Sequence, residues 1–529
     1  MVNFPSRRIT FDLRGKRMNL KEDKNLLMNG REAALPAVHA REVAALIESL
    51  GYTDRSAREW GFPDIFSLAE HLFARLQQVP ARDERASQKG GGRLSLWAET
   101  RCALRKFSLS LAYAIPWMVM LILEYLRPDA LRVSPEIGGA LSLSLIASLI
   151  TTGGFVQMIS RSGNFYYGLK EPVLAHRTCT SLLNIGLTSS LFLTLLGIMV
   201  GSYFHLFAGN YLMLAAINYL ALSLLWMLCA VLSVQGTGWC IPFIFFLSIA
   251  MSGSIKILLN SGTTILLILC PLLAASLALG CVLAGSYHAE RKNPQSKDSA
   301  RPRGGVTFIS LMQFYVYGTV YFSFLFADRL TAGSAVPWVS GLNFGIDAAY
   351  KKGTDLVLLA FLITAALVEY LADSFLRFWQ RLATELPQAA SERLMASLWK
   401  RHSKSMLAIF TAFVVLALSA WFAFSRSSSL APAPRLLQTA VLGGLGYLML
   451  SVALLEIIIL ASINAISMAS LALALGVAVN LLTGYGLSHL WGVQYAAVGL
   501  LAGSAVVLWI SNAAVRRILR HPDYHYSIS

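Results

Sequence analysis

The sequence predicts an all-α polytopic membrane protein with about twelve transmembrane helices in two six-helix bundles, preceded by a small helical cytosolic N-terminal domain. Three observations lead to this fold class. Apolar residues make up 56% of the 529 residues and charged residues only 14%, a balance typical of membrane proteins. Twelve apolar segments are each about 20 residues long, enough to cross a bilayer as a helix. One long polar linker, His288–Gly304, divides these segments six and six.

Residues 1–93 are predicted to form the cytosolic domain and its linker. Helices are expected at Pro36–Leu50 and Pro63–Gln78, with a short one at Asp54–Trp60, because apolar residues recur there at helical spacing. A helix-turn-helix could bind DNA, but no basic recognition face accompanies it. We therefore expect no nucleic-acid partner and interpret the domain as a docking site for a partner. Deleting residues 1–90 should then preserve membrane insertion and weaken the activity that depends on this partner.

The membrane region is predicted to contain a first bundle at 94–287, a cytoplasmic linker at 288–305 and a second bundle at 306–529 with a short basic tail. Leu94–Lys106 is expected to approach the bilayer as a basic amphipathic segment. The expected spanning segments are 107–126, 137–160, 180–206, 211–234, 239–258, 263–287, 306–328, 355–378, 405–425, 435–461, 463–485 and 490–515.

The distribution of Lys and Arg predicts that both termini are cytoplasmic. Outside the N-terminal domain, seventeen of these residues fall on the side of the N-terminus and seven on the other side, and cytoplasmic loops carry the excess of positive charge. Met1–Gly30 lacks the apolar run of a signal peptide, so the first spanning helix is expected to direct insertion. Glu385–Lys404 is predicted to be an amphipathic helix on the cytoplasmic surface.

The stretch from Gly305 to Trp379 is the centre of the membrane region. Its pattern predicts an apolar segment at Val306–Ala327, a polar and aromatic loop at Asp328–Thr354, and a second apolar segment at Asp355–Phe378. The loop contains Asp328 and Arg329. Ionisable groups at membrane depth usually face a cavity or a partner, so this stretch is the expected position of a functional site.

Three carboxylates are predicted to lie inside the membrane. Glu369 and Asp373 are four residues apart and share one helix face, so they could hold a proton or attract a cationic sugar. Asp373 could instead pair with Arg377 at the interface. Glu456 stands alone among apolar residues, and either a coupling role or an interhelical hydrogen bond would explain it.

Motifs of catalysis and of cofactor binding are missing from the sequence. There is no H-E-x-x-H, no G-x-x-x-x-G-K and no G-x-S-x-G. The nine histidines do not pair at metal-ligand spacing, and the six cysteines form no C-x-x-C pair. We therefore expect no enzymatic activity, no cofactor and no metal.

The order of these features resembles the membrane transporter of Pel exopolysaccharide systems (the PelG family) and the wider polysaccharide-flippase (MOP) superfamily. Asp328-Arg329 follows an aromatic-rich segment, and Tyr350 and Asp355 precede the apolar helix that bears Glu369. Further similar stretches are Gln438–Gly446, Asn480–Thr483 and Val493–Gly499. A charged Asp-Arg turn of the family pattern is replaced here by Ala461–Asn464. The resemblance implies two six-helix bundles around a V-shaped cavity, with Asp328, Arg329, Asp355 and Glu369 as functional residues.

Together these observations predict a secondary transporter that exports a polysaccharide or lipid-linked glycan across the bacterial cytoplasmic membrane by alternating access. Coupling candidates are Asp328, Arg329, Asp355, Glu369, Asp373 and Glu456. The expected partners are membrane lipid, the glycan, and proteins of an exopolysaccharide synthase complex that bind residues 1–93. The alternative is a membrane scaffold that transports nothing and recruits a cytosolic glycan synthase. A membrane transferase is less well supported, because no positioned base or metal site is evident.

Overall fold

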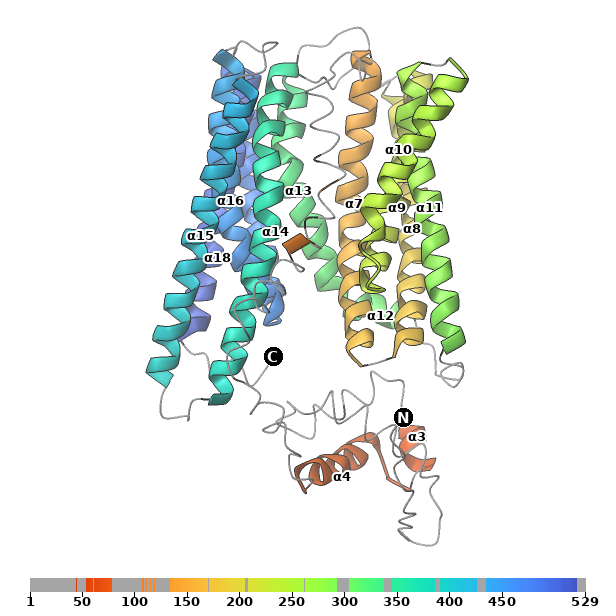
Figure 1. Ribbon diagram of the computed structural model, residues 1–529, viewed down its shortest axis with the longest axis vertical. Helices are drawn as coiled ribbons and strands as arrows, with labels where there is room; N and C mark the ends of the chain where they lie inside the picture. The colour runs from red at the N-terminus through yellow and green to blue at the C-terminus, as the bar shows by residue number, and fades with distance from the viewer. Residues whose placement is uncertain are drawn as a thin grey trace. The chain divides into compact units, whose positions relative to one another are not determined.

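The computed structural model describes residues 54–59, 61–78, 134–169, 171–204, 208–260, 262–292, 304–336, 347–385, 391–425 and 434–520, with seven isolated residues elsewhere (Figure 1). Within these residues every regular element is a helix, which confirms the predicted all-α class. Two compact units are distinguished. The first comprises Met1–Arg93, Phe165–Ala175 and Asn293–Pro302, and the second comprises Leu94–Asn164, His176–Lys292 and Arg303–Ser529.

The N-terminal helices α3 (Asp54–Glu59) and α4 (Ile65–Gln78) confirm the helices expected at Asp54–Trp60 and Pro63–Gln78. Asp64 caps α4 by accepting a hydrogen bond of 2.8 Å from the backbone N–H of Ser67. That same bond holds the pKa of Asp64 below its usual value. One face of α4 is buried through Ile65, Leu68 and Ala69. The helix expected at Pro36–Leu50 and the segment Leu94–Lys106 lie outside the described residues.

The first half of the membrane region contains five long helices in the described residues: α7 (Pro135–Gly168), α8 (Pro172–Tyr203), α9 (Gly209–Val234), α10 (Cys240–Leu258) and α11 (Thr263–Lys292). All five are long and apolar enough to cross a membrane. They match the second to sixth predicted segments. The first predicted segment, 107–126, falls outside the described residues except at isolated positions. Helix α11 packs against both α9 and α10.

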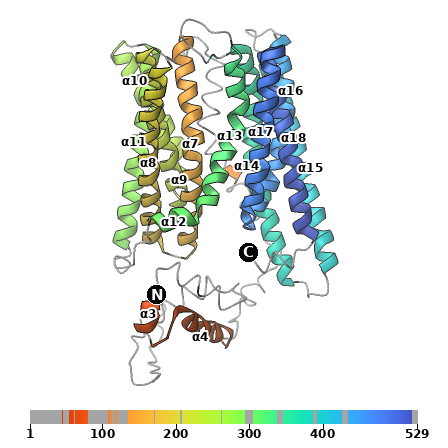
Figure 2. The same ribbon diagram turned by 180° about the vertical axis from the view of Figure 1, so that it is seen from behind.

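The second half contains α12 (Gly304–Ser310), α13 (Met312–Ser334), α14 (Ala348–Glu385), α15 (Ser391–Ser425), α16 (Pro434–Ser462), α17 (Ile466–Trp491), η4 (Val493–Tyr495) and α18 (Ala496–Arg520). Helix α18 packs against α16 and α17, α14 packs against α15 and α16, and α13 packs along α17 (Figure 2). Gly492, with φ of 115°, ends α17 in a conformation that favours glycine. Helices α14 to α18 are candidate membrane spans, with η4 joined to α18.

The two halves meet where α7 crosses α13. Gly153 on α7 faces Gly318 on α13, and Gly154 faces Tyr315 and Thr319, so the two backbones come very close. A Cβ atom added to Gly154 would lie 2.6 Å from the carbonyl oxygen of Tyr315, and one added to Gly153 would lie 3.0 Å from that of Gly318. Small residues allow helices in a membrane to pack at such short separations. This crossing therefore depends on the absence of side chains.

Both predicted bounds of the loop at Asp328–Thr354 are wrong, because the flanking helices extend into it. Helix α13 continues past Asp328 and Arg329 to Ser334, and α14 already begins at Ala348. Both helices extend because their polar residues find partners in each other, as described below. Because α14 begins at Ala348, Glu369 lies farther from the start of its helix than it would if the helix began after Thr354.

The helix predicted at Glu385–Lys404 has different bounds and is not a separate element, although its amphipathic pattern is observed. Glu385 is the last residue of α14, and Ser391–Lys404 forms the first part of α15, which continues without a break to Ser425. The amphipathic pattern arises because this part of α15 buries Leu394, Leu398 and His402 while its basic residues remain exposed.

Candidate functional site

A cluster of charged and phenolic side chains joins the end of α13 to the start of α14. Asp328 and Arg329 lie in the last turns of α13. Asp347 precedes α14 and accepts a hydrogen bond of 2.7 Å from the backbone N–H of Tyr350, a standard N-terminal cap. This cap fixes the first turns of α14 and directs Tyr350, Lys351 and Asp355 toward α13.

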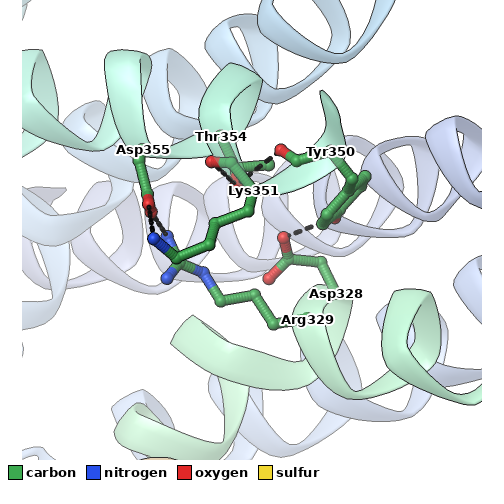
Figure 3. A network of polar contacts seen from close by, with 6 residues as sticks. All are labelled: Asp328, Arg329, Tyr350, Lys351, Thr354 and Asp355. Carbon is green, nitrogen blue, oxygen red and sulfur yellow. Dashed lines mark hydrogen bonds and ion pairs between the residues drawn. The ribbon is translucent and has the colours of Figure 1, made fainter. Parts of the chain in front are cut away.

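Asp355 is the centre of an ion-pair network (Figure 3). Its Oδ1 atom accepts a hydrogen bond of 2.9 Å from Arg329, and its Oδ2 atom lies 3.4 Å from the Nζ atom of Lys351. The Asp355 side chain is 5% exposed and that of Arg329 is 20% exposed. The Arg329 guanidinium also lies over the Phe326 ring, 5.7 Å from its centroid. One carboxylate therefore pairs with two cations at a largely buried position.

Asp328 forms the second part of the cluster. It is fully buried, and its Oδ2 atom accepts a hydrogen bond of 2.7 Å from the Tyr350 hydroxyl. Its other oxygen, Oδ1, has no hydrogen-bond partner among the described residues. The hydroxyl of Tyr447, on α16, lies close to Arg329 at a geometry short of a hydrogen bond. With Asp328 included, two carboxylates balance two cations.

The cluster is the main link between α13 and α14. These consecutive helices approach each other at few points along their length, because α13 packs on α17 while α14 packs on α15 and α16. The Arg329–Asp355 and Asp328–Tyr350 contacts bridge them. A buried, charge-balanced network of this kind fixes one relative position of two helices. Removing one partner strongly destabilises the protein, because a buried charge is then left unpaired.

Glu369 lies fourteen residues beyond Asp355 on α14, about 21 Å along the helix axis. Its side chain is exposed. Tyr317 and Tyr321 on α13 lie within the electrostatic range of Glu369, and their rings stack with centroids 6.4 Å apart.

The other two carboxylate candidates lie apart from the cluster. Asp373 forms an ion pair with Arg377 on the same helix, and both side chains are more than a third exposed. This pairing is the alternative considered for Asp373 from the sequence, where Arg377 follows it by four residues. Glu456 is fully buried in α16 and binds His402 of α15 and Asn512 of α18. The structure thus brings Asp328, Arg329 and Asp355 together and leaves Glu369, Asp373 and Glu456 at separate positions.

Several residues of these sites were not identified as candidates from the sequence. Lys351 and Tyr350 were visible as polar residues in the expected loop, but only their helical position shows that they face α13. Tyr447, His402 and Asn512 lie on three different helices, far apart in the sequence, so no local motif marks them. Among the described residues, no group of three or more His, Cys, Asp or Glu side chains is arranged to hold a metal ion.

No family model matches the sequence, and none of the curated proteins matches it. Solved structures do match. A point mutant of the Vibrio cholerae MATE transporter VcmN superposes with a TM-score of 0.57 and 14% identity, over 80% of this chain and 97% of that one. The membrane region has the fold of a MATE transporter. The bent form of VcmN (TM-score 0.54, 14% identity, 80% and 97% covered) agrees with this assignment.

A third structure with the MATE-type fold is an outward-facing multidrug resistance MATE family transporter of the MOP superfamily. Its TM-score is 0.51 and its identity 13%, over 81% of this chain and 97% of the other. These low identities show the fold alone. The match covers 97% of each of these three transporters. It thereby confirms the expected class, a polytopic helical membrane protein with about twelve spanning helices.

Proposed function

We propose that this protein is a secondary transporter that moves a polysaccharide or lipid-linked glycan across the bacterial cytoplasmic membrane by alternating access, with both termini in the cytoplasm. The observation that carries the proposal is the MATE-type fold, which extends over 80% of the chain. The close crossing of α7 and α13 supports it further, because two halves joined through small residues can rock against each other.

The glycan substrate is supported by chemistry near α13 and α14 and by the resemblance to Pel exopolysaccharide transporters. Glu369 is exposed, and the stacked rings of Tyr317 and Tyr321 lie within the electrostatic range of its carboxylate. A carboxylate accepts hydrogen bonds from sugar hydroxyl or ammonium groups, and aromatic faces pack against sugar rings and attract cations. These groups together suit a polyhydroxylated substrate, whether neutral or cationic.

The proposal is tested by reconstitution. The full-length protein is placed in liposomes with an imposed proton or sodium gradient, and transfer of a fluorescently labelled glycan or lipid-linked glycan is measured. We expect transfer that depends on the protein and the gradient. The absence of transfer for every glycan and gradient, with the other proteins of the export apparatus added, would exclude transport and favour the scaffold.

Glu369→Gln is expected to lower the initial transport rate at least tenfold with normal protein yield. This substitution keeps the size and the hydrogen bonding of the side chain but removes its charge. The matched comparison is Asp373→Asn, one helical turn away, which should cause a smaller loss because that charge is already paired with Arg377 in an exposed position. Equal rates for wild type and Glu369→Gln at every pH would leave this carboxylate a structural role only.

A further inference from the structure

His402, Glu456 and Asn512 form a buried junction between three helices of the second half. The Nε2 atom of His402 lies 3.1 Å from Oε2 of Glu456, and the Asn512 amide donates a hydrogen bond of 2.8 Å to Oε1. His402 and Glu456 are both fully buried. The His402 ring is edge-on to Phe375 of α14, so four helices contribute to the junction.

The first half contains a counterpart in which glutamine stands in place of the glutamate. His176 on α8 lies 3.1 Å from the amide nitrogen of Gln235, at the end of α9, and 3.3 Å from the hydroxyl of Ser286 on α11. His176 and Ser286 are 110 residues apart, and so are His402 and Asn512. Counted in chain order within the six predicted segments of each half, α8, α9 and α11 take the same places as α15, α16 and α18. The same junction therefore occurs twice, with glutamine in one half and glutamate in the other.

The glutamate changes what the second junction can do. An ionised carboxylate only accepts hydrogen bonds, and Glu456 accepts one from Asn512, so His402 is assigned as the donor through Nε2–H. The lone pair then resides on Nδ1, which has no hydrogen-bond partner in the described part of the chain. A proton added to Nδ1 gives an imidazolium that pairs with the carboxylate and stacks on Trp399, whose ring centroid is 5.3 Å away and tilted by 18°.

The other charged groups around the junction lie at its edge. On α18, Arg516 stands over the Trp399 ring at 5.4 Å. On α15, Arg401 donates a hydrogen bond to Ser374 of α14, while Lys400 and Lys404 are exposed. On α14, Asp373 and Arg377 pair with each other. Glu456 is the only ionisable residue near this end of α16 in the described chain, which leaves His402 as its partner.

We propose that His402, Glu456 and Asn512 form a proton-binding site that holds the ends of α14, α15, α16 and α18 together. One proton from the aqueous phase binds at Nδ1 of His402 and converts the hydrogen-bonded pair into an ion pair. The neighbouring Trp399 is 37% exposed, and the adjoining Lys400 and Arg401 are exposed charged residues, which supports access from water. Its existence rests on this geometry alone, and only its effect on transport rests on the proposed function.

The test uses the fluorescence of Trp399, which a stacked imidazolium quenches. Purified full-length protein in nanodiscs is titrated from about pH 8 to about pH 5, the range in which histidine changes charge. The signal of Trp399→Phe is subtracted from that of wild type, which removes the other tryptophans. We expect a reversible decrease of the difference signal on acidification, and we expect His402→Gln to abolish it. Glu456→Gln, which copies the first-half junction, should move the decrease to lower pH because the imidazolium loses its counter-ion.

The matched control is His176→Gln, which removes the corresponding histidine of the first half and should leave the Trp399 signal as in wild type. A flat difference signal in wild type, or an unchanged decrease in His402→Gln, overturns the proposal. Size-exclusion profiles establish whether each variant is folded. If His402→Gln does not fold, the conservative Glu456→Gln provides a second test. A fluorescence change without any glycan transfer would refute the transport function and leave the proton site in place. Glycan transfer without a fluorescence change would refute the proton site and leave the transport function in place.

Discussion

Replacing Gly154 by leucine is expected to reduce the transport rate by about tenfold to a hundredfold. A Cβ atom at this position would lie 2.6 Å from a backbone oxygen of Tyr315 and 2.8 Å from the Thr319 hydroxyl. The backbone cannot yield as a flexible side chain would, so α7 and α13 must separate. Overpacking of this kind costs about 1–3 kcal/mol, and about 1.4 kcal/mol changes a population tenfold. The state in which the two halves touch is therefore depleted.

The measurement is the initial rate of glycan transfer in liposomes for the series Gly154→Ala, Gly154→Val and Gly154→Leu, which should decline with side-chain volume. Gly280→Leu is the matched control on α11, because a Cβ atom there has no atom of the described residues within 4 Å. It should behave as wild type. A Gly154→Leu protein that transports at the wild-type rate would show that this crossing is not needed in the cycle.

Asp355→Asn is expected to destabilise the second half by about 3–5 kcal/mol, the cost of leaving a buried charge without its partner. The substitution retains the shape of the side chain but removes the charge that neutralises Arg329 and Lys351. We expect a clear decrease in the temperature at which half of the protein is lost from the monodisperse peak in size-exclusion chromatography.

The double variant Arg329→Met with Asp355→Leu should recover much of this stability, because well-packed apolar residues can replace a buried ion pair. Asp373→Asn breaks an exposed ion pair instead and should cost about 1 kcal/mol or less. If Asp355→Asn is as stable as wild type, the cluster does not clamp α13 to α14, and its charges would have to be explained by substrate binding.

The apolar segments and their order could be predicted from the sequence because burial in lipid demands about 20 apolar residues in each helix. The segments from 137 onward match observed helices closely. The ends of α13 and α14 could not be predicted. Asp328, Arg329 and Lys351 are polar residues that favour a loop when considered singly, and only their mutual pairing allows them to lie within helices.

The candidate site was predicted in part. Asp328, Arg329 and Asp355 were named through a resemblance, and the structure places them in one cluster. His402 was missed for a physical reason: exposed Lys400, Arg401 and Lys404 surround it in sequence, so the segment has the composition of a surface helix. The equal spacing of 110 residues between His176 and Ser286 and between His402 and Asn512 was present in the sequence. It gains meaning only once the structure shows that both pairs join helices at the same places in the order of each half.

The length of α14 has a mechanical consequence. Its 38 residues span about 57 Å, whereas a bilayer with its headgroups is about 40–45 Å thick. Helix α15, with 35 residues, is similarly long and packs beside α14. The two therefore act as a stiff lever whose outer arm reaches into water. A tilt of about 10° around the bilayer midplane would displace the tip of a half-length of about 28 Å by about 5 Å, roughly one helical turn. A protein bound to that arm would sense each transport cycle as a movement of its own binding surface.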